Sequence, residues 1–343
     1  MLKSIQHLRG YSAFGVAIFH IYPMFIFDSK FPIWPLAAGV DVFFVISGFI
    51  MWKISNQRET TPLEFILNRI NRIVPPYWIA TLILFACVTA KPNLFPVYDP
   101  SLEHLTASLA FIPHRVGDND MPFLIQGWTL NYEMFFYAVF TASLFVVRKH
   151  RLALITAMIL ALVLIGLMVP EKGPIARAYL NPLLLEFLAG IYLAVAVERK
   201  IFVPAPLAFI IIPAAVLCIF AQLGEAGQRA IYWGGPSAAI VWSMVSLETW
   251  KPFPNSPALM LIGSASYSIY LTHSLAGTIY KVVAGILGLP VDGPIALAFG
   301  LLSALISGIA FHHFVEIRLQ RTLTPVVRKI LAKITRKPQN RIS

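Results

Sequence analysis

The chain has 343 residues, of which 58% are hydrophobic and 13% are charged, with a net charge of +11 and a mean hydropathy of +0.73. Soluble domains carry about twice this fraction of charged residues, so the composition excludes an ordinary soluble fold. So much positive charge on a soluble protein would suggest nucleic acid. Here, however, the apolar residues come in runs of about 20, which match the roughly 30 Å of hydrocarbon in a bilayer. We therefore expect membrane lipid around one helical bundle, and no nucleic-acid partner.

The apolar runs predict an all-α integral membrane protein, a bundle of about ten transmembrane helices with short interfacial helices. The fourth and ninth runs are the longest, and we expect them to be broken or re-entrant. The sequence shows neither a solenoid-like repeat nor the match between halves that many transporters have. The spans are expected at residues 10–28, 34–52, 75–91, 123–147, 152–169, 179–197, 202–222, 230–247, 257–283 and 294–315.

The first run and the cysteines exclude several other features. The run begins near Arg9 and is too long for the core of a typical signal peptide, so we expect a retained first span. Cys87 and Cys218 lie inside apolar runs, without the spacing of a disulfide framework or a CxxC metal motif. Histidines and carboxylates are scattered over several spans. No metal is therefore expected.

The basic residues lie mostly on one side of the predicted spans. With the N-terminus in the cytoplasm, the inside segments hold 20 of the 27 Lys and Arg residues, the outside segments hold six, and Lys281 lies at a span end. Cytoplasmic segments are enriched in Lys and Arg. The bias therefore predicts that both termini face the cytoplasm.

Residues 61–74 predict an amphipathic helix on the inner membrane surface. A capping box opens it, an apolar stripe follows one face, and two prolines are expected to end it. The residues concerned are Thr61, Pro62 and Glu64 at the start, Arg69 and Arg72 on the polar face, and Pro75 and Pro76 at the end.

The chain is expected to divide into a polytopic membrane domain over residues 1–320 and a basic cytoplasmic tail over residues 321–343. The tail repeats the amphipathic pattern, which favours an anchor to anionic lipid. Its apolar stripe consists of Val327, Ile330, Leu331 and Ile334, and its cations include Arg328, Lys329, Lys333 and Arg336.

Ionisable groups inside apolar spans are costly and mark functional candidates. Arg9 and His20 are eleven residues, or about three turns, apart and share one face of the first span, with about 16 Å between them along the axis. His20 would lie near the bilayer centre, where it could take a proton from an attacking hydroxyl. The alternative is a neutral histidine bonded to a neighbouring helix.

Two carboxylates and one polar helix face add further candidates. Asp41 could orient a histidine or pair with an arginine, or it could be a purely structural partner. Glu133 is the only charge in the aromatic run Trp128–Tyr137, and an aromatic belt at the membrane surface does not explain it. The ninth span aligns Ser266, Tyr270 and His273 on one face, and Glu186, His312, His313 and Glu316 lie in other spans.

Together these segments resemble the membrane acyltransferase-3 family over about residues 4–320. Each motif is weak alone, but the ordered set is specific, and the run at 128–137 is most similar to exopolysaccharide-production acetyltransferases, the ExoZ type. The matching segments are Arg9 with His20, Gly39–Phe49, Phe65–Tyr77, Trp128–Tyr137 and Tyr267–His273; Glu316 resembles the family's last glutamate, although the proline that often follows is not at its usual place.

The resemblance implies an enzyme of the bacterial inner membrane that moves an acetyl group from cytoplasmic acetyl-CoA to a sugar hydroxyl. The acceptor would be a cell-surface or exported polysaccharide or its lipid-linked precursor. It also implies His20 as the base, which Glu133 or Asp41 would support. The planar forks of arginines at the inner surface suit the phosphates of CoA. We expect Arg9, Arg69, Arg72 and Tyr77 around the donor, and Trp128, Tyr270 and His273 around the acceptor.

The alternative function is a transporter or flippase with a histidine–carboxylate proton relay. The carboxylates and histidines for a relay are present, but the internal repeats of many transporters are not. Within the enzyme hypothesis, direct transfer and a relay through a tyrosine or serine both stay open. The chain could also form a homo-oligomer.

Overall fold

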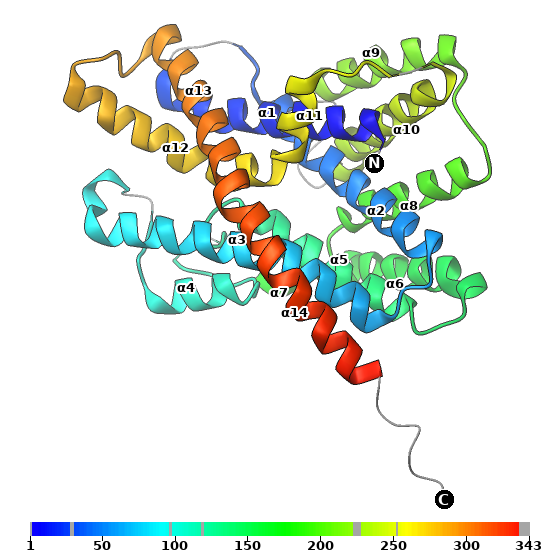
Figure 1. The fold of residues 1–343 in the computed structure, drawn as a ribbon. Helices are drawn as coiled ribbons and strands as arrows, with labels where there is room; N and C mark the ends of the chain where they lie inside the picture. The colour runs from blue at the N-terminus through cyan, green and yellow to red at the C-terminus, as the bar shows by residue number, and fades with distance from the viewer. Residues whose placement is uncertain are drawn as a thin grey trace, which may run out of the picture.

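The computed structural model describes residues 2–27, 31–95, 98–117, 120–221, 228–251 and 253–335, and every regular element in these ranges is a helix (Figure 1). The predicted all-α class is confirmed. The α-helices are α1 (Lys3–Phe25), α2 (Gly39–Gln57), α3 (Pro62–Ala90), α4 (Leu102–Leu109), α5 (Gly127–Ser143), α6 (Arg148–Met168), α7 (Pro174–Tyr179), α8 (Leu184–Glu198), α9 (Ala205–Ala221), α10 (Gly235–Trp250), α11 (Pro257–Ser264), α12 (Ser266–Leu287), α13 (Gly293–Phe311) and α14 (Ile317–Thr335). The 3-10 helices η1 (Trp34–Ala38) and η2 (Pro92–Leu94) and the π-helical turns η4 (Ala230–Gly234) and η5 (His312–Glu316) join them.

Five helical stretches of the described chain are long and apolar enough to cross a membrane, judged by length and composition. The apolar helix α9 is shorter. Integral membrane character is therefore supported, whereas the number of ten crossings stays a prediction. The five stretches are Trp34–Gln57, Pro62–Ala90, Arg148–Met168, Pro174–Glu198 and Gly293–Ile334.

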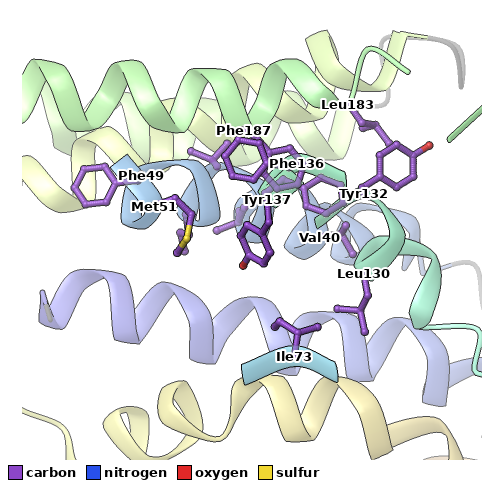
Figure 2. Close-up of a cluster of buried hydrophobic side chains, with 14 of the residues drawn as sticks. Val40, Phe49, Met51, Ile73, Leu130, Tyr132, Phe136, Tyr137, Leu183 and Phe187 are labelled. Carbon is purple, nitrogen blue, oxygen red and sulfur yellow. The ribbon is translucent and has the colours of Figure 1, made fainter. Parts of the chain in front are cut away.

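Two glycines allow α2 and α8 to touch backbone to backbone. A Cβ atom on Gly48 would lie 1.9 Å from the carbonyl oxygen of Phe187, and one on Gly190 would lie 1.9 Å from that of Val45. Small residues at such crossings are typical of membrane helices. Beside this contact the ring of Phe187 stacks on that of Phe136, with centroids 4.4 Å apart (Figure 2). The close contact between α2 and α8 holds α2 in place on one side of the bundle centre.

Helix α3 corrects the predicted interfacial helix. Thr61 does cap it, since its hydroxyl accepts a hydrogen bond of 3.1 Å from the backbone N–H of Glu64. The expected end at Pro75 and Pro76 is wrong, because both prolines lie inside one continuous helix. In membrane bundles neighbouring groups support the backbone at such prolines. The carbonyls that Pro75 and Pro76 leave without a helical donor are those of Asn71 and Arg72. Close to them, Tyr267 of α12 donates a hydrogen bond of 2.7 Å to the carbonyl of Ile73, which joins this part of α3 to α12.

The long ninth run is broken, as expected, and its two helices, α11 and α12, meet at Ala265. The fourth run forms a shorter helix, α5, than residues 123–147 predict. At the C-terminal end α13, η5 and α14 follow one another without a break, and α14 crosses α3 (Figure 1). Helix α14 spans the expected domain boundary at residue 320, while Arg336 and the rest of the tail lie outside the described residues.

Polar contacts at the helix ends form two separate groups. Asn56 at the end of α2 accepts a hydrogen bond of 2.7 Å from Arg148 at the start of α6, and its amide lies 2.9 Å from Glu198 at the end of α8. All three were expected in the cytoplasm. The pairs expected outside also meet, Arg115 with Asp120 at 2.8 Å and Arg177 with Asp120 at 2.7 Å. This grouping agrees with the alternating topology.

The topology is testable by labelling. In a variant with Cys87 and Cys218 replaced by alanine, a single cysteine is placed at His150 or at Lys172. We expect a membrane-impermeant maleimide added to intact inner-membrane spheroplasts to label position 172 and not position 150, because the basic bias places them on opposite sides. Labelling of position 150 from outside would contradict the topology.

Candidate active site

A cavity of about 150 Å³ lies between α1, α2, α3, α5 and α12. Its lining is mostly apolar with a few polar groups, as in ligand sites generally. Figure 2 shows Tyr137 pointing from the aromatic cluster toward Ile73, with Met51 and Leu130 nearby, and all four residues line the cavity. Its charged lining residues are Arg9, Arg69, Arg72 and Glu133.

The three arginines come from two helices that meet at the cavity. Buried Arg9 donates a hydrogen bond of 3.1 Å from Nη1 to Gln6 on the same helix. Arg69 and Arg72 lie one turn apart on α3, and the guanidinium of Arg69 is 6.0 Å from the ring of Phe65. The Nε atom of Arg69 is buried and has no hydrogen-bond partner in the described chain. Several guanidinium forks around one cavity suit an anion with multiple phosphate oxygens.

Glu133 joins two walls of the cavity. Its carboxylate accepts a hydrogen bond of 3.1 Å from Ser47 of α2 and another from Tyr137, one turn along α5. Both hydroxyls donate to the same oxygen, Oε1, so these two contacts fix the carboxylate through one of its oxygens. One carboxylate opposite three guanidinium groups leaves the lining with an excess of positive charge.

His20 of α1 and His273 of α12 contact each other beside the cavity. Their ring centroids are 5.0 Å apart, and Nε2 of His273 is 3.2 Å from Nδ1 of His20. Tyr270, which lines the cavity, has its ring 6.0 Å from that of His273 and its hydroxyl 2.9 Å from Thr129. The histidine pair therefore adjoins the cavity through Tyr270 without being part of its lining.

Carbonyl groups determine which ring nitrogens of the pair carry protons. A carbonyl only accepts, so Nδ1 of His20 donates to Val16 at 3.0 Å and Nδ1 of His273 donates to Ile269 at 3.1 Å. In the neutral rings Nε2 is then the unprotonated nitrogen. Nε2 of His273 accepts from His20, while Nε2 of His20 makes no hydrogen bond within the described residues. It is the nitrogen left to take up a proton.

Gln126 completes the surroundings of His273. Its amide nitrogen lies 2.6 Å from the hydroxyl of Ser274 and 3.4 Å from Nε2 of His273, and the side chain is buried. The amide therefore donates toward the same lone pair that faces His20. Gln126 was not predicted from the sequence, because it lies just before the aromatic motif and is 147 residues from His273.

Asp41 is paired at a second polar site. Its buried carboxylate accepts hydrogen bonds of 3.0 and 2.7 Å from Nε and Nη2 of Arg229. The guanidinium of Arg229 lies 5.7 Å from the ring of Trp128 and 4.7 Å from that of Trp233, within cation–π range. The sequence alone does not identify Arg229 as the partner of Asp41, since 188 residues separate the two.

Residues 2–313 match a family model described as an acyltransferase domain. The chain belongs to the acyltransferase-3 family. It is 40% identical to the exopolysaccharide production protein ExoZ of Rhizobium meliloti (strain 1021) over 284 aligned residues. The aligned region covers 82% of this chain and 88% of ExoZ. It is 25% identical to the O-acetyltransferase OatA of Staphylococcus aureus (strain NCTC 8325 / PS 47), over 96% of this chain but 57% of OatA. No solved structure matches the chain.

Most of the predicted site residues of the acyltransferase lie in one of three groups: the cavity lining, the histidine pair beside it, and the surroundings of Arg229. Tyr77 lies behind the cavity wall, fully buried, and donates a hydrogen bond of 3.2 Å to the carbonyl of Ser108. A Cβ atom on Gly127 would lie 2.6 Å from this tyrosine hydroxyl, so Tyr77 packs α3 against α5. Of the other predicted residues, Arg9, Arg69, Arg72, Glu133 and Tyr270 line the cavity, His20 and His273 adjoin it, and Asp41 and Trp128 surround Arg229.

The ion pair predicts a stability effect in the acyltransferase. We expect Asp41→Ala to lower its thermal stability in detergent, because removing one partner of a buried pair costs about 3–5 kcal/mol. The double variant Asp41→Leu, Arg229→Met removes both charges and should recover most of the loss. A single variant as stable as the wild type, measured by thermal unfolding, would show that the pair does not hold this region together.

Proposed function

We propose that this acyltransferase is a membrane O-acetyltransferase, which moves an acetyl group from acetyl-CoA to a sugar hydroxyl. The acceptor is a cell-surface or exported polysaccharide or its lipid-linked precursor. The observation that carries the proposal is a cationic cavity that adjoins a histidine with a free basic nitrogen. The names of the relatives, an exopolysaccharide production protein and an O-acetyltransferase, support it. Family membership favours acyl transfer over a transporter or flippase.

The arginines provide the donor end of the site. CoA is an anion that does not cross lipid, so its phosphates must meet cations at the cytoplasmic surface. Arg69 and Arg72 lie on the half of α3 that was expected there, and Arg9 joins them in the cavity. Bidentate guanidinium groups bind phosphate strongly. The acetyl thioester, on its flexible arm, would then extend along α1 toward His20, about 16 Å from Arg9 along the helix axis.

His20 provides the base for a direct transfer. Its Nε2 takes the proton of the sugar hydroxyl as the oxygen attacks the thioester carbonyl. A carbon–oxygen bond forms, the carbon–sulfur bond breaks, and the imidazolium returns the proton to the CoA thiolate. Holding both substrates in one dry site supplies much of the rate.

His273 and Gln126 act through His20. Nε2 of His273 accepts a share of the Nδ1 proton of His20, which keeps that proton on Nδ1 and leaves Nε2 basic. Gln126 donates toward the same atom of His273 and limits rotation of the ring. In this arrangement His273 is a positioning residue beside the acceptor and not the base itself.

Replacing the base should abolish turnover and spare the donor site. We expect His20→Gln to lose about a hundredfold to ten-thousandfold in acetyl transfer, since an amide cannot accept the proton. Binding of acetyl-CoA to purified protein should stay near wild type, because the arginines are unchanged. A well-folded His20→Gln protein that acetylates glycan at the wild-type rate would make His20 structural, and the base would be sought elsewhere.

Replacing the cavity arginines should instead weaken binding of the donor. We expect Arg69→Gln, Arg72→Gln to weaken acetyl-CoA binding at least about tenfold, because two charge-assisted contacts to phosphate are lost. The matched control is Arg199→Gln, Lys200→Gln, which removes two exposed charges at the end of α8. Titration calorimetry in detergent measures the acetyl-CoA affinity of both variants. Equal donor affinity in both variants would remove Arg69 and Arg72 from the donor site.

The positioning role of His273 predicts partial rescue. We expect His273→Ala to lower kcat and change the pH profile of acetyl transfer, whereas His273→Gln, which keeps an acceptor, should retain part of the rate. His114 is the control, because its ring lies 5.0 Å from that of His104, the same spacing as between His20 and His273. His114→Ala should leave both parameters unchanged. Equal kcat loss in His273→Ala and His273→Gln, with an unaltered pH profile, would contradict positioning.

A further inference from the structure

Helix α14 presents three different faces along its length. At 3.6 residues per turn, one face carries Leu323, Thr324 and Val327, which are partly buried where α14 packs on α3. The next face carries Val326, Ile330 and Ile334, which are 48, 43 and 53% exposed. The remaining face is basic and exposed. Its cations are Arg318, Arg321, Arg328, Lys329 and Lys333, and the helix contains no Asp or Glu.

This order of faces suits a membrane surface. A helix in the interface buries an apolar strip below the headgroups while its cations remain at headgroup level. In α14 the exposed apolar strip lies between the packed face and the basic face, so both requirements can be met without separating α14 from α3. Five cations and no anion are complementary to anionic headgroups, and each Lys or Arg near such a surface adds to the attraction.

One contact connects α14 with the donor end of the cavity. The amide of Asn71 on α3 donates a hydrogen bond of 3.2 Å to the hydroxyl of Thr324 on α14. Asn71 lies between Arg69 and Arg72, which both line the cavity. A displacement of α14 would therefore act on the segment of α3 that carries the two arginines.

A second connection runs through the π-helical turn before α14. Glu316 in this turn is buried and accepts a hydrogen bond of 2.6 Å from Ser268 of α12 and one of 3.3 Å from Gln320 of α14. Ser266 and Tyr267, next to Ser268, line the cavity. π-Helical turns occur frequently at functional sites. Two cavity walls, α3 and the start of α12, are thus bonded to one amphipathic helix.

We propose that α14 binds anionic phospholipid, and that this contact holds the two cavity walls in the geometry described above. The lipid fixes α14 through its cations and apolar strip. Thr324 and Gln320 transmit the restraint to α3 and, through Glu316, to α12. The lipid-binding step stands independently of the reaction, whereas an effect on acetyl transfer rests on the proposed function.

Hydrogen exchange of α14 tests the lipid-binding step directly. The full-length protein is placed in nanodiscs of phosphatidylcholine, either alone or with about a third phosphatidylglycerol. We expect the anionic lipid to slow amide exchange over residues 326–335 at least about tenfold, since several cations contribute and local opening limits exchange there. The variant Arg328→Gln, Lys329→Gln, Lys333→Gln should lose this response.

A charge-matched variant separates α14 from the net charge of the protein. Lys149→Gln, Arg199→Gln, Lys200→Gln removes the same charge from exposed positions at the ends of α6 and α8. It should respond to phosphatidylglycerol like the wild type. High salt should reduce the response, because surface charges are screened. Inorganic phosphate added to phosphatidylcholine discs should not reproduce it, because phosphate lacks a bilayer for the apolar strip.

The outcomes decide the two steps separately. No response of the wild type to phosphatidylglycerol, an equal response of the α14 variant, or a full effect of inorganic phosphate would overturn the lipid-binding step. Where lipid binding holds, acetyl transfer should rise with phosphatidylglycerol in the wild type and the matched control but not in the α14 variant. An unchanged rate in the wild type would overturn the coupling to the cavity. A protein without transferase activity would contradict the proposed function and leave the exchange result standing.

Discussion

An ionisable group inside a lipid-surrounded bundle is costly unless it is paired, and the arrangement of the site depends on this constraint. Most of the buried groups are paired, whereas both carboxylate oxygens of Glu186 lack a hydrogen-bond partner among the described residues. Asp41 is paired with the guanidinium of Arg229, Glu316 accepts hydrogen bonds from Ser268 and His312, and Glu133 accepts two hydroxyl hydrogen bonds at Oε1. Glu133 offsets only one of the three positive charges that Arg9, Arg69 and Arg72 bring to the cavity. A cationic cavity beside α1 follows, and in our proposal an anionic cofactor completes it.

Helix α1 sets the distance between the two chemical ends of the site. Arg9 and His20 lie on one face of a single helix, so their separation of about 16 Å is fixed by helix geometry. The helix is held closely near Arg9, where a Cβ atom on Gly263 of α11 would lie 2.1 Å from the carbonyl of Gln6. At the other end, His20 contacts His273 of α12. A rigid spacer between a donor end and a base suits a donor with a long arm.

Local patterns in the sequence predicted the features that depend on neighbouring residues. These include the cap at Thr61, the shared face of Arg9 and His20, the break in the ninth run, and the motifs by which the family was identified. For features that depend on distant residues, the sequence allowed an arginine partner for Asp41 and a neighbouring helix as the partner of His20, but it did not identify the partner residues. Arg229 finds Asp41 across 188 residues, and His273 finds His20 across 253. The error at Pro75 has another origin, because a membrane bundle tolerates prolines inside a helix and the two prolines alone therefore do not mark its end.

The central claim is that one protein holds acetyl-CoA at its cationic cavity and passes the acetyl group to a sugar. The most direct measurement uses purified protein in sealed vesicles of defined orientation, with radiolabelled acetyl-CoA on one face and a polysaccharide or lipid-linked sugar fraction as acceptor. We predict alkali-labile acetyl ester on the sugar and an equal amount of free CoA, only with donor on the face that carries the C-terminus. Free CoA without sugar ester, or ester formed equally from either face, would contradict the account.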